Sequence, residues 1–157
     1  MQSFRIKQAE SADEICQMRR LFEEYAEELD ESLCFQNFQD ELASLPGLYG
    51  PPRGKLLIAL SGGAAAGCVA LRPIEDGYCE MKRLYVRPQF RGNKLGRKLA
   101  EEIIGHGQQL GYSGMRLDTL QKLGPALRLY EQLGFKPTAP YNHNPLPGVV
   151  YLELNYR

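Results

Sequence analysis

The stretch Cys79–Leu99 constrains the fold most, because a β-prone run passes through a basic, glycine-containing turn directly into a helical pattern. Aromatic, β-branched and long-chain residues fill Tyr78–Val86 without a breaker, which favours a strand that ends near Arg87, before Pro88. Beyond the turn, apolar residues recur at nearly helical spacing, at Leu95, Leu99, Ile103 and Leu110. The sequence therefore predicts a strand that feeds a helix through a short basic turn.

The turn Arg91–Gly96 favours phosphate binding. Where a strand feeds a helix, unpaired backbone N–H groups and the positive end of the helix dipole meet at one point. Glycine lets a ligand approach the backbone there, and three basic side chains in or beside the turn add charge suited to a pyrophosphate. A purely structural alternative stays open, in which the glycines only allow a tight turn and close helix packing.

The remaining patterns predict a mixed α/β (α+β) fold. We expect a strand at residues 4–7, a helix that opens with a capping box at Ser11–Glu14 and carries an apolar stripe over 15–29, and a second helix over 35–45. Further strands are expected over 55–60, 67–74, 78–86 and 115–119, followed by a helix from 124 to 133 and strands from 135 and over 149–154. The acidic residues of the first helix are expected on a solvated face; they are Glu23, Glu24, Glu27 and Glu28. Strands 78–86 and 115–119 must run parallel, because a helix crosses between them. The predicted sheet is mostly antiparallel, with one central parallel βαβ pair flanked by helices.

Size and charge exclude several classes of protein. With 157 residues the chain has room for one globular domain, residues 1–157. Lys plus Arg number 19 and Asp plus Glu number 19, so no overall field attracts nucleic acid or an anionic membrane. Four cysteines without CxxC spacing are expected to be reduced and mostly buried, and we expect no metal site and no membrane span. A cytoplasmic protein is expected, and a homodimer is compatible with the sequence.

Two motifs resemble the GNAT superfamily of N-acetyltransferases. RGNKLGRKL after MKRLYV is similar to its acyl-CoA signature, Arg/Gln-x-x-Gly-x-Gly/Ala, with Arg91 and Gly96 at the matching ends. Lys94 replaces the first signature glycine and is expected in ordinary helical backbone. ALRLYEQLGF at 126–135 resembles the motif A-x-x-L-Y-x-x-x-G-F, although Leu123 stands where many members carry a cofactor-binding asparagine. Together with the order of elements, the resemblance covers nearly the whole chain.

The resemblance implies acetyl-CoA as the cofactor and transfer of its acetyl group to a primary amine within a ternary complex. The acceptor is then a small-molecule or peptide amine. The two parallel strands are expected to separate, so that the pantetheine arm pairs with strand backbone and the diphosphate lies at the turn. The implied cofactor-binding residues are Leu84, Tyr85, Val86, Arg91, Gly92, Asn93, Lys94, Leu95, Gly96 and Arg97.

The resemblance also implies two catalytic residues. Tyr130 fits the general acid that protonates the departing thiolate of CoA; the alternative is a buried aromatic residue on a packing face. Glu80 matches a glutamate base of several members, and by strict alternation it is expected on the same strand face as Val86. The alternative for Glu80 is a solvated carboxylate paired with Lys82 or an arginine.

The acceptor and one rival function stay open. The loop around His143 is a candidate lining of the acceptor site, and single arginines such as Arg72 or Arg83 can bind a carboxylate, but nothing in the sequence ranks them. A non-catalytic acyl-CoA-binding sensor or regulatory module is the alternative to an enzyme. A dinucleotide-binding Rossmann unit is disfavoured, because the turn lacks the G-x-G-x-x-G spacing.

Overall fold

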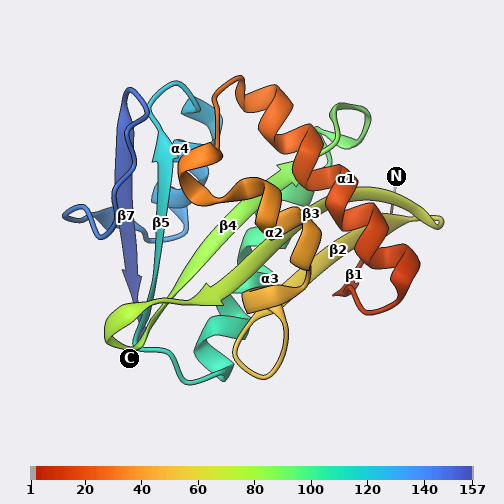
Figure 1. The fold of residues 1–157 in the computed structure, drawn as a ribbon, viewed down its shortest axis with the longest axis horizontal. Helices are drawn as coiled ribbons and strands as arrows, with labels where there is room; N and C mark the ends of the chain where they lie inside the picture. Colours follow the sequence, from red (N-terminus) through yellow and green to blue (C-terminus); the bar gives the residue numbers. More distant parts are fainter. Residues whose placement is uncertain (1–2, 157) are drawn as a thin grey trace.

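The computed structural model describes residues 3–156, without the side chain of Phe35. Across these residues the strands form one seven-stranded sheet in the order β1-β2-β3-β4-β5-β7-β6 (Figure 1). The strands are β1 (Arg5–Gln8), β2 (Lys55–Ser61), β3 (Ala64–Pro73), β4 (Tyr78–Val86), β5 (Gly114–Leu120), β6 (Lys136–Pro137) and β7 (Val149–Asn155). The helices are α1 (Ala12–Leu29), α2 (Phe38–Ser44), α3 (Leu95–Gln109) and α4 (Gly124–Gln132). Short 3₁₀ turns lie at Cys34–Gln36, Gly47–Tyr49, Glu75–Gly77 and Pro88–Phe90.

Helices cover both faces of the sheet (Figure 1). The α1 face, covered by α1 and α2, buries Met18, Leu21 and Phe22 against strand residues such as Ile58. The α3 face, covered by α3 and α4, buries a second core that includes the apolar stripe of α3. Each helix has one apolar stripe, and each needs a sheet face to bury it. The sheet therefore lies between two hydrophobic cores.

The predicted order of the main elements is confirmed, and so is the capping box. Ser11 Oγ accepts the Glu14 N–H at 3.1 Å, and Glu14 Oε1 accepts the Ser11 N–H at 3.1 Å. This reciprocal pair satisfies two N–H groups that a helix start leaves without partners. The largest differences in bounds are the start of β3, at residue 64 rather than 67, the start of α2, at residue 38 rather than 35, and β6, which has only two residues.

The parallel pair of β4 and β5 is confirmed, and it opens after three residues. Tyr78, Cys79 and Glu80 pair with Gly114, Met115 and Arg116. Beyond these positions β4 continues to residue 86 and β5 to residue 120 without pairing to each other. The backbone groups that β4 turns toward β5 therefore have no strand partner there, and the sheet has an opening at its centre.

A β-bulge at Arg83 changes which side chains of β4 face which core. Cys68 of β3 pairs with Tyr85, but Ala70 pairs with Lys82, so β4 carries one extra residue between these pairs. Arg83 takes a positive φ of 63°, as the first residue of such bulges often does. The side chains of Lys82 and Arg83 consequently both lie on the α1 face.

The prediction that Glu80 and Val86 share a strand face is therefore wrong. Glu80 precedes the bulge and faces α1 and α2, whereas Val86 follows it and packs against the α3 core. Period-two alternation holds only while each residue of a strand has one partner on its neighbour.

One further expectation needs correction. Cys68 and Cys79 are buried, but Cys16 and Cys34 are exposed, so the cysteines are not mostly buried. Glu23, Glu27 and Glu28 of α1 are exposed as expected, and Glu24 and Glu28 also form ion pairs with Arg87 and Arg91. No helix among residues 3–156 is both long and apolar enough to cross a membrane.

Candidate active site

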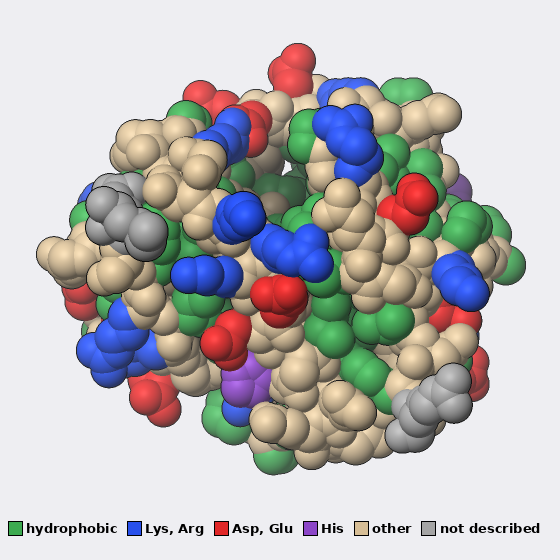
Figure 2. Space-filling view, turned by 180° about the vertical axis from the view of Figure 1, so that it is seen from behind, with side chains coloured by type: hydrophobic (Ala, Val, Ile, Leu, Met, Phe, Trp, Pro, Cys, Tyr) green, Lys and Arg blue, Asp and Glu red, His purple; other side chains and the backbone are tan. Residues whose placement is uncertain are grey.

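A groove begins at the opening between β4 and β5 and runs to the start of α3. Eight of the ten residues predicted to bind the cofactor line it, namely Leu84, Tyr85, Val86, Arg91, Gly92, Lys94, Leu95 and Gly96. The other two are not among its lining residues: Asn93 donates a hydrogen bond to the Phe90 carbonyl, and Arg97 contacts Glu101 and Gln132. Seen from the α3 side, the surface has a hollow with hydrophobic side chains in its depth and both basic and acidic side chains around it (Figure 2). The groove thus combines an apolar lining with charged side chains, namely Arg91, Lys94 and Glu28.

The turn before α3 differs from the prediction at Lys94. This residue caps α3 in the left-handed region, with φ 60° and ψ 22°, so the expectation of ordinary helical backbone is wrong. The first intrahelical hydrogen bond runs from the Lys98 N–H to the Lys94 carbonyl. Within residues 3–156 the N–H groups of the first turn, residues 95–97, donate to no backbone carbonyl, so they can bind an anion. The signature glycine is therefore replaced by a residue that keeps the conformation glycine favours.

Arg91 joins the turn to both β4 and α1. Its Nε donates to the Val86 carbonyl at 2.9 Å, and its Nη2 donates to the two carboxylate oxygens of Glu28 at 2.7 and 2.8 Å. Both side chains are about half exposed, at 46% and 49%. An exposed pair of this kind is weak, so an anionic ligand can replace Glu28 as the partner of Arg91.

A narrow cavity, which we call the channel, extends from the groove through the opening of the sheet. The channel and the groove adjoin, because they share five lining residues, namely Tyr25, Leu29, Leu84, Leu123 and Ala126. Tyr130 of α4 lines the channel, and its ring packs edge-on against Phe135 with centroids 5.8 Å apart. Burial raises the pKa of Tyr130 above the usual phenol value, so its hydroxyl stays protonated at neutral pH and can donate a proton.

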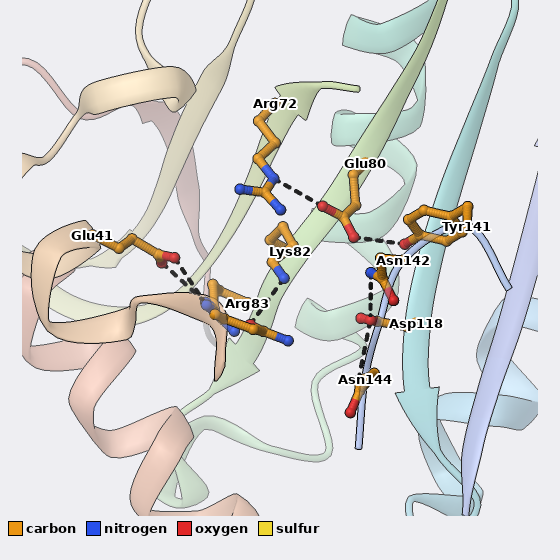
Figure 3. Close-up of polar contacts among 10 residues, drawn as sticks. Glu41, Arg72, Glu80, Lys82, Arg83, Asp118, Tyr141, Asn142 and Asn144 are labelled. Carbon is orange, nitrogen blue, oxygen red and sulfur yellow. Dashed lines mark hydrogen bonds and ion pairs between the residues drawn. The ribbon is translucent and has the colours of Figure 1, made fainter. Parts of the chain in front are cut away.

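On the α1 face, β4 buries three charged residues beside the channel: Glu80, Lys82 and Arg83 are 0%, 6% and 4% exposed. Charges are rarely buried at this depth unless they are paired. Figure 3 shows them between Glu41 on one side and the 141–144 segment on the other.

Glu80 has a partner for each carboxylate oxygen. Its Oε1 accepts Arg72 Nε at 2.8 Å, and its Oε2 accepts the Tyr141 hydroxyl at 2.6 Å (Figure 3). Burial and the charge of Glu80 raise the pKa of Tyr141. Glu80 is thus paired with an arginine, as one sequence interpretation expected, but it is buried rather than solvated. It lines a second cavity beside the channel, together with Arg116 and Tyr141.

Arg83 is paired equally well. Its Nε and Nη2 donate to the two oxygens of Glu41 at 3.0 and 2.9 Å, and its guanidinium lies over the Phe38 and Tyr25 rings. Arg72 and Arg83, both candidate carboxylate binders, therefore already hold carboxylates of this chain. The buried Tyr49 hydroxyl, by contrast, has no hydrogen-bond partner within residues 3–156.

Lys82 and Asp118 were not singled out as site residues in the sequence, yet both line the channel with Tyr130. Lys82 Nζ donates to Gln36 Oε1 at 3.0 Å. Asp118 Oδ2 accepts the side-chain amides of Asn142 and Asn144, at 3.0 and 3.2 Å. The two residues come from β4 and β5, on opposite sides of the opening, so only the sheet pairing brings them together.

The segment 138–148 contributes to the site differently from expected. Tyr141, Asn142 and Asn144 line the channel or its neighbouring cavity, but the exposed His143 lines neither. An imidazole would have been the obvious catalytic group of this loop; the loop instead supplies a hydroxyl and two amides. These groups hold Glu80 and Asp118 in place.

Comparison with known proteins places these features in a family. The sequence model described as the acetyltransferase (GNAT) family matches residues 15–135. An uncharacterised N-acetyltransferase of Schizosaccharomyces pombe is 54% identical over 138 residues, which cover 87% of this chain and 85% of that protein. The residues that the family model matches include both predicted motifs, at 91–96 and 126–135.

Solved structures share the fold. An acetyltransferase of Streptococcus agalactiae superposes with a TM-score of 0.82 at 24% identity, covering 99% of this chain and 100% of that one. The PaiA N-acetyltransferase of Thermoplasma acidophilum, solved in complex with coenzyme A, has a TM-score of 0.76 at 18% identity, over 98% and 99% of the two chains.

Proposed function

Because this chain belongs to the GNAT family of acetyltransferases, we propose that it moves the acetyl group of acetyl-CoA to a primary amine by direct attack within a ternary complex. The observation that carries the proposal is the continuous path from the start of α3, along β4 and through the opening of the sheet to Tyr130. A cofactor bound in the groove and an amine entering from the α1 face would meet in the channel.

The groove fits acetyl-CoA on the chemistry of its lining. The free N–H groups of the first turn of α3, with Lys94 and Arg91 beside them, suit the diphosphate. The unpaired edge of β4 at Leu84–Val86 suits the amides of the pantetheine arm, which would add to the sheet as a strand does. The similar PaiA protein binds coenzyme A, which supports the same cosubstrate here.

Tyr130 is the proposed general acid. The amine nitrogen attacks the thioester carbonyl carbon, the new C–N bond forms, and the C–S bond breaks with its electron pair on sulfur. Tyr130 donates its proton to that sulfur; its raised pKa means that the hydroxyl is protonated at neutral pH before the thiolate forms. The nitrogen loses two protons in total: one balances the proton in the CoA thiol, and the other goes to solvent.

Glu80 is the proposed base, and its hydrogen bond with Tyr141 suggests the route by which it would receive a proton. Its Oε2 holds the Tyr141 hydroxyl at 2.6 Å, so a proton from the amine would pass to the Tyr141 oxygen while Tyr141 gives its own proton to Glu80. Replacement by Glu80→Gln would remove the final acceptor and leave a side chain of similar shape.

A thiol-release assay tests the proposal. Purified protein is incubated with acetyl-CoA and a broad panel of amines, and release of free CoA is followed with a thiol reagent. We expect release with some amines, and Tyr130→Phe should slow it by about 10²-fold or more, with coenzyme A affinity by calorimetry nearly unchanged. Tyr112→Phe is the matched control, because Tyr112 is equally buried but lines neither the groove nor the channel.

Two results would contradict the proposal. If acetyl-CoA binds and no amine releases thiol, the chain is a non-catalytic acyl-CoA sensor or regulatory module. If acetyl-CoA gives no heat at saturating concentration, the assignment of the groove fails as well.

We also propose that residues 1–157 act as one N-acetyltransferase domain in the cytoplasm, alone or as a homodimer. The balanced charge of the chain supports a small-molecule or peptide amine, rather than nucleic acid, as the partner.

A further inference from the structure

The buried charges of β4 are unequally compensated. Glu80 forms an ion pair with Arg72, and Arg83 forms one with Glu41. Lys82, which is 6% exposed, belongs to no ion pair within residues 3–156 and donates only to the neutral amide of Gln36. An ammonium group has three donors, so two remain for another acceptor.

A buried ammonium without a counter-charge is unfavourable. Burial lowers the pKa of Lys82, while Glu80 and Asp118 oppose that shift and Arg83 adds to it. The neighbouring arginines cannot serve a ligand in its place, because Arg72 and Arg83 already bind carboxylates of the chain. Lys82 is therefore the cation of the channel that still lacks an anion among the described residues.

Asp118 offers the opposite charge across the opening. The amides of Asn142 and Asn144 both bind its Oδ2, which orients the carboxylate and leaves Oδ1 without a hydrogen bond from another described residue. Asp118 and Lys82 line the same channel but form no ion pair with each other. Figure 3 shows the two side chains on the facing strands β4 and β5. The channel thus has a cationic end and an anionic end, with space between them.

We propose that the acceptor is a free amino acid, whose carboxylate binds Lys82 and whose ammonium group binds Asp118 before it loses its proton. This inference rests on the proposed function and adds its substrate class. Two opposite charges at two fixed points select a molecule that carries both charges close together, and Tyr130 lines the same channel. An amine without a carboxylate would leave the Lys82 ammonium uncompensated.

Matched acceptor pairs test the inference. The twenty common amino acids are compared, in the thiol-release assay, with the amines that result from removing their carboxylates. A hydrogen bond to a charged group predicts kcat/KM about 10- to 100-fold higher for the preferred amino acid than for its decarboxylated partner. We expect Lys82→Met to bring that ratio close to one, and Lys82→Arg to keep part of it.

Controls separate binding from folding. Methionine keeps the apolar stem of Lys82, and coenzyme A affinity measured by calorimetry reports whether the variant is folded. Lys136→Met, at an exposed lysine that lines neither the groove nor the channel, should leave the ratio unchanged. Asp118→Asn should raise KM for the amino acid.

The inference is overturned if the decarboxylated amines are preferred, or if Lys82→Met slows both members of a pair equally. Failure of the proposed function looks different, because no amine then releases thiol. In that case calorimetry of the same amino acids against the coenzyme A complex decides the inference: heat that Lys82→Met abolishes supports the two-charge site, and no heat overturns it.

Discussion

The two halves of β4 use charge in different ways. The half near Val86, which we propose binds the cofactor and call the cofactor half, meets charged residues that are about half exposed, such as Arg91 and Glu28. The other half, which we propose faces the acceptor and call the acceptor half, buries Glu80 and Arg83, each with a paired partner. Exposed pairs contribute little to stability and can exchange partners, whereas breaking a buried pair leaves a charge without solvent. We infer that the acceptor half is built for fixed geometry and the cofactor half for release and rebinding.

The sharpest test of this contrast is Glu41→Gln in the acceptor half. The change leaves the Arg83 guanidinium, 2% exposed in its side chain, without a counter-charge. We expect a loss of roughly 3–5 kcal/mol in the free energy of unfolding, measured by urea denaturation. The matched change in the cofactor half, Glu28→Gln, should cost at most about 1 kcal/mol. Equal losses would remove the distinction between the two halves.

A smaller effect is expected where β3 approaches the cofactor half. Gly67 pairs with Val86, and a Cβ there would lie 2.6 Å from the Tyr85 carbonyl oxygen. Gly67→Ala should therefore destabilise the protein by about 1–3 kcal/mol, because backbone must shift. Gly105→Ala is the control, since a Cβ on that residue of α3 meets nothing within 4 Å. A Gly67 variant as stable as the Gly105 variant would show that the backbone of β3 and β4 can shift at little cost in free energy.

Lys94 provides a test of backbone strain in the cofactor half. Its left-handed conformation is unfavourable for any residue with a Cβ. Lys94→Gly should raise the free energy of unfolding by up to about 1 kcal/mol, whereas Lys94→Ala removes the same charge but keeps the strain. If alanine stabilises as much as glycine does, the charge rather than the backbone is responsible.

The smallest effect concerns cofactor affinity. Glu28 binds the Arg91 guanidinium that a diphosphate would need, so Glu28→Gln should tighten coenzyme A binding, by up to about fivefold at low salt. The gain should fade as added salt screens exposed charges. Titration calorimetry at two ionic strengths measures both changes, and weaker binding by the variant would show that Glu28 supports the site.

The geometry of the cofactor half, though not its role, could be predicted because its features are local in sequence. A strand, a basic turn and a helix start follow one another within about twenty residues, and eight of the ten predicted residues line one groove. The exception is Lys94, because composition does not reveal that a lysine will take the left-handed conformation.

The acceptor half could not be predicted in the same way. Lys82 and Asp118 are 36 positions apart, and they meet only through the parallel pairing of β4 and β5. No glycine in the sequence indicates the bulge at Arg83. Strict period-two alternation along β4 therefore placed Glu80 on the same face as Val86, which is wrong. Asn142 and Asn144 orient Asp118 through their side-chain amides. Such contacts occur at no fixed spacing in the sequence, so they could not be predicted either.

The bulge also has a consequence for how such a protein can vary. Before the bulge the even-numbered side chains of β4 face α1, and after it the odd-numbered side chains do. Inserting one further residue after Arg83 would send Leu84 and Val86 toward α1, while Tyr85 would cross to the α3 core. The strand therefore accepts exchanges of one amino acid for another far better than insertions, and chimaeras assembled from related genes should keep their junctions outside residues 78–86.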